Sequence, residues 1–352
     1  VYLKEKNMSK LKFSAIGLRH AHIYGMCSEL IKAGAELVSF YDDDAESRAL
    51  FAKQFPQAAE ARCEEEILND KNISLVTGAA ITSMRAELGI RVMRSGKDYF
   101  TDKGPFTTLS QLDEVKKVIA ETGKKYMVCY SERLQSECSE MAGKLIREGA
   151  IGDVYQVIGL GPHRLSAKTR PEWFFQKKLY GGIIADICSH QFEQFLYFSS
   201  EPDADVVYAR ACNIAHPEYP ELEDFGEVSL KGKNGTSGYL RVDWFTPDGL
   251  ASWGDVRTLI MGTQGYIELR KNLDITGAKS GGEHLFITTN SSPTKYIDCN
   301  NTVGHPFFAA FIDDCLNRTE NAMKQDYCLK AAEICLKAQA FADNLNMNIG
   351  SK

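Results

Sequence analysis

Residues 11–42 read LKFSAIGLRHAHIYGMCSELIKAGAELVSFYD, and this stretch decides the fold. The apolar run 11–17 predicts a buried strand, residues 22–31 predict a helix, and residues 36–41 predict a second buried strand. A strand, a glycine turn, a helix and another apolar strand are typical of a parallel sheet with crossover helices. The chain therefore begins as an α/β protein.

The same alternation continues to about residue 130. Further strands are expected at 73–78, 98–101 and 126–130, with helices at 44–55, 82–94 and 110–121. Because the strands are apolar throughout, both faces of their sheet should be covered by helices. We expect an N-terminal Rossmann parallel sheet that forms a nucleotide-binding domain over residues 8–130.

The pattern changes in the second part of the chain. Helices are expected at 137–148, 183–198, 306–316 and 327–345, with a strand at 154–160. Between 204 and 297, runs with period two are separated by turn signals at 233–235, 247–249 and 271–272. This pattern predicts a C-terminal α+β domain over residues 131–345, which holds a large, mostly antiparallel open sheet and serves substrate binding and oligomerisation.

Composition excludes several classes of protein. The chain has 352 residues, a net charge of −6 and no basic stripe, so we expect no nucleic-acid partner. No apolar run reaches the ~18–20 residues that span a bilayer, so we expect no membrane contact. Ten scattered cysteines without a CxxC pair indicate reduced thiols, no metal site and a cytoplasmic protein. The polar start does not resemble a signal peptide, and Met8 is expected to be the natural first residue.

The turn after the first strand lies where a dinucleotide fingerprint belongs. Such a turn uses glycines and free helix N–H groups to approach a pyrophosphate. Only Gly17 matches the GxGxxG pattern, while Arg19 and His22 replace the other two glycines. Arg19, His20 and His22 are donors that suit a diphosphate, and we prefer this interpretation to a histidine metal site.

Asp42 follows the second strand and is expected to bind the adenosine ribose. A carboxylate there would repel a 2′-phosphate, which favours NAD, although Arg19 keeps NADP as an alternative. The competing role for Asp42 is a helix N-cap, which Asp44 could fill instead.

Two further segments carry candidate chemistry. Lys103 ends the predicted strand at 98–101, where a lysine can stabilise negative charge on a substrate oxygen. Asp186 and His190 are four residues apart on a predicted helix and follow the pair Gly181-Gly182. A carboxylate beside an imidazole raises its pKa, so this pair suits proton transfer from an alcohol. A structural Asp–His pair is the alternative.

These motifs resemble the glucose–fructose oxidoreductase / inositol dehydrogenase / MocA-like (Gfo/Idh/MocA) family from Leu11 to about Asn344. The family's Glu-Lys-Pro signature corresponds to residues 102–105, its GGxxxDxxxH segment to residues 181–190, and its closing stretch to residues 304–308. The resemblance implies a catalytic trio in which His190 is the acid/base, Asp186 orients and tunes it, and Lys103 contacts both the reacting oxygen and the nicotinamide. Ala80 stands where the family often has a Thr-Pro turn at the cofactor, and Arg85 where a histidine soon follows.

The resemblance also implies the substrate class and assembly. An NAD(P)-dependent oxidoreductase of this family acts on a sugar, cyclitol or related polyol, and its open sheet joins a homodimer or homotetramer. Residues expected at the substrate, besides His190, are Tyr130, Arg133, His163, Arg164, Arg170 and Trp173. Arg164 or Arg170 would suit a carboxylate or phosphate on the substrate.

Two other functions fit the same fold. One is a non-catalytic NAD(P)- or sugar-sensing regulatory protein, which the altered glycine fingerprint favours. The other is a redox-assisted glycosidase in which tightly held NAD cycles without net turnover.

Overall fold

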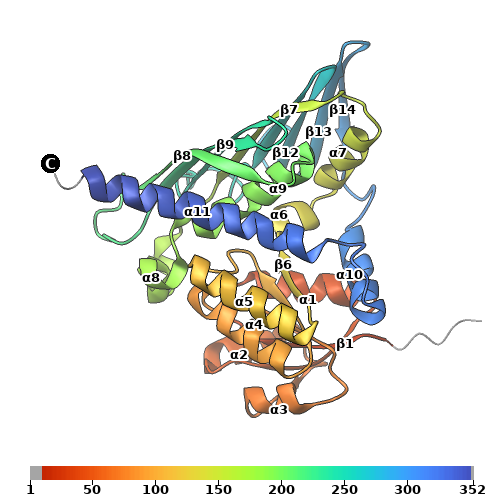
Figure 1. Cartoon of the computed structure of the whole chain (residues 1–352), viewed down its shortest axis with the longest axis vertical. Coiled ribbons are helices and arrows are strands. Elements are labelled where there is room, and N and C mark those ends of the chain that lie inside the picture. The colour runs from red at the N-terminus through yellow and green to blue at the C-terminus, as the bar shows by residue number, and fades with distance from the viewer. Residues whose placement is uncertain (1–9, 350–352) are drawn as a thin grey trace, which may run out of the picture.

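The computed structural model describes residues 10–349, so the expected start at Met8 lies outside the described residues. The first part is a six-stranded sheet with the order β3-β2-β1-β4-β5-β6 (Figure 1). All of its strand pairs are parallel, as predicted. The strands are β1 (Lys12–Ile16), β2 (Glu36–Tyr41), β3 (Ala59–Glu60), β4 (Leu75–Gly78), β5 (Asp98–Asp102) and β6 (Tyr126–Cys129).

Helices join these strands and cover both faces of the sheet. They are α1 (His22–Lys32), α2 (Ala45–Gln54), α3 (Glu64–Asn69), the 3₁₀ turn Thr82–Met84, α4 (Arg85–Arg94) and α5 (Leu109–Thr122). Local signals set their ends: Thr108 and Gln111 form a capping box at α5, and Gly123 ends that helix in the left-handed region. The short β3 and α3 were not expected, because a two-residue strand and a six-residue helix carry too little periodicity.

The second part is an eight-stranded sheet with the order β14-β13-β12-β11-β7-β10-β9-β8. Only the β7–β10 pair is parallel, so the predicted mostly antiparallel sheet is confirmed. The strands are β7 (Val154–Pro162), β8 (Ala204–Cys212), β9 (Phe225–Gly232), β10 (Ser237–Asp243), β11 (Arg257–Gly262), β12 (Gly265–Leu273), β13 (Ser280–Thr289) and β14 (Ser292–Asp298).

The turn expected at 271–272 is wrong, because both residues belong to β12. Asn272 has a φ of 75°, and the register with β13 shifts between Lys271 and Leu273. Residues 271–272 therefore form a β-bulge, which has turn-like residues but changes the direction of neighbouring side chains within a continuous strand.

Helices cover the face of the second sheet that points toward the first (Figure 1). Those that contact the sheet include α7 (Glu137–Arg147), a π-helix (Ile184–Cys188) and α9 (Ser189–Ser199). The same part of the chain also holds α6 (Ser131–Leu134), α8 (Lys177–Tyr180) and 3₁₀ turns at Ala167–Thr169 and Glu172–Phe175. The opposite face of this sheet carries no helix in Figure 1.

The last two helices return to the first sheet. The helix α10 (Pro306–Asn317) packs against α1, and α11 (Gln325–Ile349) lies across both parts of the molecule (Figure 1). The rings of Phe307, Phe308 and Phe311 surround Phe100 of β5, with centroid distances of 6.0, 6.2 and 5.0 Å. One apolar core thus connects the end of the chain to its beginning.

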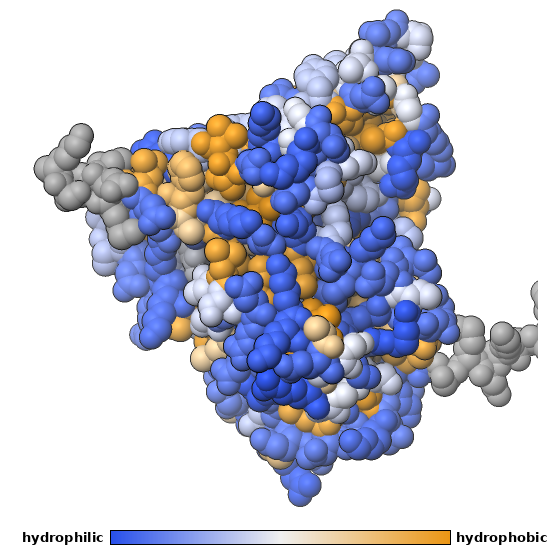
Figure 2. All heavy atoms as spheres, in the orientation of Figure 1, coloured by the Kyte–Doolittle hydropathy of each residue, from blue (hydrophilic) through white to orange (hydrophobic). Residues whose placement is uncertain are grey.

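Figure 2 shows hydrophilic side chains over most of one face, with hydrophobic atoms mainly along α11 and near the top of the second sheet. Within residues 10–349, no helix has both the length and the apolar character needed to cross a bilayer.

Candidate active site

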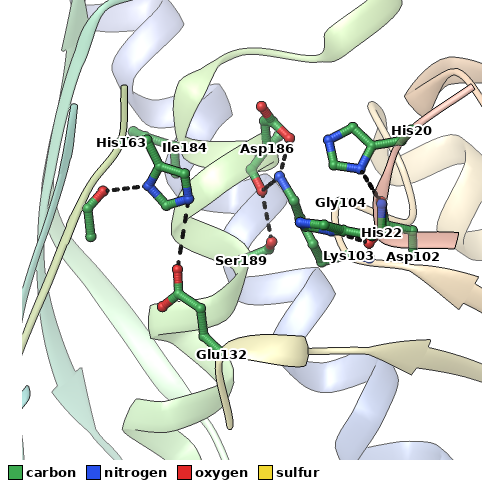
Figure 3. Close-up of polar contacts among 12 residues, drawn as sticks. His20, His22, Asp102, Lys103, Gly104, Glu132, His163, Ile184, Asp186 and Ser189 are labelled. Atoms are coloured by element: carbon green, nitrogen blue, oxygen red, sulfur yellow. Dashed lines mark hydrogen bonds and ion pairs between the residues drawn. The ribbon is translucent and has the colours of Figure 1, made fainter. Parts of the chain in front are cut away.

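A buried lysine connects the two parts of the molecule. Lys103 follows β5, is 4% exposed, and donates its backbone N–H to Asp102 Oδ1 at 2.7 Å. Its Nζ contacts the Asp186 carboxylate and also donates to the Asp186 carbonyl at 3.2 Å (Figure 3). The next residue is Gly104, with a φ of 63°, where a Cβ would lie 3.2 Å from the Ala185 carbonyl oxygen. The glycine therefore permits the close approach that brings Lys103 to Asp186.

Asp186 lies in the π-helix Ile184–Cys188, a wide turn that is often found at functional sites. Gln339 of α11 holds the start of this turn, because its Oε1 accepts from the N–H groups of Ile184 at 3.0 Å and Ala185 at 3.2 Å. Gly182 makes room for that amide, since a Cβ there would lie 2.4 Å from it. Burial alone would raise the pKa of Asp186, but the charge and hydrogen bond of Lys103 hold it below its ordinary value.

His190 lies in the first turn of α9, 2% exposed. Its Nδ1 has no hydrogen-bond partner among the described residues. Burial, followed by the charges of Lys103 and His22, holds the pKa of His190 well below its ordinary value. The expectation that Asp186 raises this pKa is therefore wrong, because the π-turn directs the carboxylate to Lys103.

The fingerprint turn is anchored on Asp102. This carboxylate is fully buried and contacts His22 Nδ1 at 2.8 Å, His20 Nδ1 at 3.1 Å and Arg85 at 3.1 Å (Figure 3 shows the histidines). Burial would raise the pKa of Asp102, but His22, Arg85 and His20 bring it well below its ordinary value. Burial, and then His22, lowers the pKa of His20 to about 4, so His20 is neutral at pH 7.

His20, His22 and Asp102 place three ligand atoms within 4.8 Å of one another. The Arg85 guanidinium already bonds this carboxylate, and Lys103 follows Asp102 directly, so the local positive charge disfavours a metal cation. Arg85 also donates to the carbonyls of Ala80 and Lys103, which fixes the loop after β4 against the loop after β5.

The geometry beside β1 and β2 fits the adenosine half of a dinucleotide. Gly17 has a φ of 79°, and a Cβ there would lie 2.8 Å from the Ala80 side chain. Asp42, at the end of β2, accepts from the Leu18 N–H at 2.6 Å and from Arg19 at 3.3 Å. Asp42 is not the N-cap of α2, because Asp44 takes that role and accepts from the Ser47 N–H.

An open cavity of about 460 Å³ lies over this edge of the sheet. Its wall includes Gly17, Arg19, Asp42, Asp43, Ala80, Ile81 and Met84. A glycine turn, a carboxylate at the second strand and an apolar floor are the features that such a nucleotide requires, so the residues present fit the group.

A second cavity, of about 260 Å³, lies beside His190. It is lined by His22, Ser131, Glu132, Gln135, Ser136, His163, His190, Trp253, Lys271, Asn272 and Glu283. The two parts of the molecule meet here, since His22 comes from the fingerprint turn and its ring lies 6.4 Å from that of His190. Of the residues expected at the substrate, the structure brings His163 and His190 to this cavity.

The other residues expected at the substrate lie elsewhere. Tyr130 donates to the Cys328 carbonyl at 3.0 Å, and Arg133 is buried against Glu193. Arg164 donates to two backbone carbonyls, those of Pro247 and Leu250, and its side chain lines a different cavity. Trp173 is buried beside Phe174.

Arg170 donates to the Leu165 carbonyl at 2.9 Å and stacks over the rings of Phe174 and Trp244. Neither Arg164 nor Arg170 lines the cavity beside His190, so the structure does not place a guanidinium there for an anionic substrate.

The two carboxylates and the lysine of the cavity, Glu132, Glu283 and Lys271, were not expected from the sequence. Glu132 lies between two residues that were expected there, and its burial is set by α6 and α9 packing together. Lys271 was hidden by its turn-like neighbour Asn272, and Glu283 lies on β13 beside it. No sequence signal marks Glu132 or Glu283, and the bulge beside Lys271, a feature that often lies next to active sites, is visible only in the fold.

Comparisons with known proteins agree with this geometry. Residues 14–130 match the profile of an oxidoreductase family with an NAD-binding Rossmann fold, and residues 140–268 match the GFO/IDH/MocA C-terminal domain. A crystal structure of a candidate oxidoreductase from Erwinia carotovora atroseptica SCRI1043 is 46% identical. It matches over 95% of this chain and 99% of its own, with a TM-score of 0.91.

Two curated relatives match over shorter stretches. The scyllo-inositol 2-dehydrogenase (NADP(+)) IolW of Bacillus subtilis is 26% identical over 51% of this chain and 48% of its own length. The D-xylose dehydrogenase of Paenarthrobacter nicotinovorans is 25% identical over 36% of this chain and 34% of its own. The chain thus spans between a third and a half of these relatives. Together with the two domain profiles and the full-length structural match, these comparisons show that the chain belongs to the Gfo/Idh/MocA family of oxidoreductases and carries its NAD-binding Rossmann domain.

Proposed function

We propose that the protein is an NAD(P)-dependent dehydrogenase or reductase that acts on a hydroxyl-bearing carbon of a sugar, cyclitol or related polyol. The observation that carries this proposal is the convergence of Lys103 and His190. Lys103 extends from the first sheet and contacts Asp186 in the π-helix. Its charge helps to lower the pKa of His190. His190 lines a cavity between the two parts of the molecule.

Each group has a role that its surroundings support. His190 is neutral at pH 7, since its pKa is held well below the usual value, so it can accept the proton of a substrate hydroxyl. Lys103 forms an ion pair with Asp186 and would stabilise negative charge on the reacting oxygen. Asp186 is the residue that positions Lys103. His22, which contacts Asp102, brings a second imidazole ring to the lining of the cavity.

The nucleotide would lie along the first sheet. When bound, NAD supplies the acceptor or donor of hydride. Gly17 and Ala80 would form the floor of the adenosine site, Arg19 and the histidines of the turn would face the diphosphate, and Asp42 would bind the ribose. Two further carboxylates, Asp43 and Asp44, follow Asp42, so we favour NAD over NADP.

The test is binding followed by turnover. NAD and NADP are screened by thermal shift, and then sugars and cyclitols are screened for NADH or NADPH formation. Reduction of added cofactor by a polyol supports a dehydrogenase. Cofactor binding without turnover of any polyol would point to a sensing protein. A nucleotide that co-purifies and is never exchanged would point to redox-assisted glycoside cleavage.

We also propose a homodimer or homotetramer in the cytoplasm. The strands of the second sheet leave large side chains exposed, among them Tyr155 at 50%, Tyr208 at 39% and Tyr296 at 44%. All ten cysteines lie within the described residues and are free thiols, which suits a reducing compartment. Light scattering after size exclusion measures the assembly directly.

A further inference from the structure

Two hydrogen-bond acceptors face each other in the cavity beside His190. His163 follows β7, and its Nδ1 lies 3.1 Å from the Gly161 carbonyl oxygen. A carbonyl can only accept, so Nδ1 carries the hydrogen and Nε2 presents a lone pair. Burial, followed by the charge of Lys103, lowers the pKa of His163 to about 3, so the ring stays neutral. That Nε2 lies 3.9 Å from Oε1 of Glu132 (Figure 3).

The Glu132 carboxylate is fixed in this orientation. Its Oε2 accepts from the side-chain amides of Gln191 at 2.7 Å and Gln194 at 3.3 Å, both on α9. Its Oε1 is buried without a hydrogen-bond partner among the described residues. Burial raises the pKa of Glu132, while the charge of Lys271 and the hydrogen bond from Gln194 oppose that rise. A buried acceptor that lacks a donor is costly, and at 3.9 Å neither member of the pair hydrogen-bonds the other. A ligand that brings two donors would complete the arrangement.

The charges around this pair are unfavourable to an anion. Two carboxylates, Glu132 and Glu283, line the cavity together with one ammonium group, that of Lys271. The Nζ of Lys271 donates one hydrogen bond to the Glu132 carbonyl oxygen, and its single positive charge faces the two carboxylates of the cavity. Glu283 Oε2 accepts from Ser136 Oγ and from the Cys138 N–H.

We propose that Glu132 and His163 determine substrate specificity by accepting hydrogen bonds from two adjacent hydroxyl groups of an uncharged sugar or cyclitol. Each hydroxyl carries one donor, so a vicinal diol can serve two acceptors 3.9 Å apart, one hydrogen to each. Sugar acids and sugar phosphates are excluded by the two carboxylates. This inference rests on the proposed function, because the cavity holds the substrate only if the reacting carbon lies at His190.

The substitution Glu132→Gln tests the pair directly. A glutamine amide can donate to His163 Nε2, which satisfies the histidine internally and removes the negative charge. The comparison variant Glu283→Gln removes the same charge from the same cavity without changing the acceptor pair. The matched control is Glu218→Gln, because Glu218 is exposed and lies outside the cavity, so its replacement shows the effect of losing one negative charge elsewhere.

Binding and turnover are measured separately on purified full-length protein with saturating NAD. The panel contains D-glucose, D-galactose and myo-inositol, each beside a mono-deoxy analogue, together with D-glucuronate and D-galacturonate. Binding is followed by thermal shift, and turnover by NADH absorbance. For the unmodified protein, the neutral polyols should bind about 10- to 100-fold more tightly than the deoxy analogue that lacks one of the paired hydroxyls.

Glu132→Gln should bind a neutral polyol no more tightly than its deoxy analogue. It should also reduce the difference in affinity between neutral sugars and sugar acids. Glu283→Gln should reduce the difference in affinity between neutral sugars and sugar acids but leave the preference over the deoxy analogue unchanged. The proposal is overturned if acids bind as well as their neutral counterparts, if no polyol of the panel binds, or if Glu132→Gln leaves the preference intact. Selective polyol binding without NADH formation, and without NADPH formation when NADP replaces NAD, would instead reject the proposed dehydrogenase and leave the specificity pair standing.

Discussion

The ammonium group of Lys103 contacts the carboxylate of Asp186 although 83 positions separate them in the chain. Their side chains are 5% and 9% exposed, so the pair is largely withdrawn from water. Removing one partner of such a pair leaves an uncompensated buried charge, which is far more costly than removing both.

Asp186→Asn should therefore lower the free energy of unfolding by about 3 kcal/mol and reduce turnover about 100-fold, because Lys103 loses its anchor. Urea denaturation and steady-state kinetics measure the two effects. The double variant Lys103→Met with Asp186→Asn should recover part of the stability but none of the turnover. Full stability in Asp186→Asn would show that the pair contributes nothing to the fold.

His190→Ala should reduce turnover about 100- to 10,000-fold while NAD affinity stays near that of the unmodified protein. The reason is that His190 lines the cavity beside Lys103 and does not line the adenosine cavity over β1 and β2. Stopped-flow hydride transfer and fluorescence titration with NADH separate the two quantities. Equal loss of both would mean that His190 supports the structure only.

Asp42→Ala should weaken NAD binding about tenfold and relax the discrimination against NADP, since the carboxylate at the end of β2 is removed while Arg19 remains. Asp113→Ala is the control, because it removes an equal charge from an exposed position on α5 that does not line the adenosine cavity. Titration of each variant with both nucleotides gives the ratio of affinities. An unchanged ratio in Asp42→Ala would exclude its role at the ribose.

Acid should unfold the protein in a window set by three buried histidines, His20, His163 and His190. Their pKa values fall from an ordinary 6.5 to about 4, to about 3 and well below 6.5 respectively, chiefly through burial. The unfolded chain binds these protons first, so the stability is fully present above pH ~6.5 and is lost as the pH falls toward the folded values. Each histidine contributes a slope of up to about 1.4 kcal/mol per pH unit.

Urea denaturation at several values between pH 7 and pH 5 measures this slope. His163→Gln should reduce the slope by the contribution of one histidine, because the glutamine amide does not titrate in this pH range. A slope that is the same with and without His163 would mean that this ring is also neutral in the unfolded state, or is charged in both states.

The sequence predicted the elements whose periodicity is long and simple. The helix at His22–Lys32 and the strand at Glu36–Tyr41 match the expected 22–31 and 36–41. What it could not supply was the direction of side chains across long distances. Helical spacing predicted Asp186 beside His190, but in the π-helix the Asp186 carboxylate contacts Lys103, which follows a strand of the first sheet. Local spacing cannot reveal such a partner.

The candidate site residues show the same limit of sequence-based prediction. Position after a strand was enough to mark Lys103, which lies at the junction of the two parts. Residue type was not enough for Arg164, whose guanidinium donates to the backbone carbonyls of Pro247 and Leu250 in the loop after β10. Glu132 became visible only when the fold placed it opposite His163, and Lys271 only when a bulge in a strand replaced an expected turn.

The packing of Phe307, Phe308 and Phe311 around Phe100 bears on how this protein can be cut or recombined. A gene fragment ending near residue 130 would encode every strand of the first sheet, yet it would leave Phe100 without the rings that shield it. Such a fragment should aggregate rather than behave as an autonomous nucleotide binder. Swapping nucleotide preference between relatives is therefore better attempted by exchanging the first half together with the last two helices.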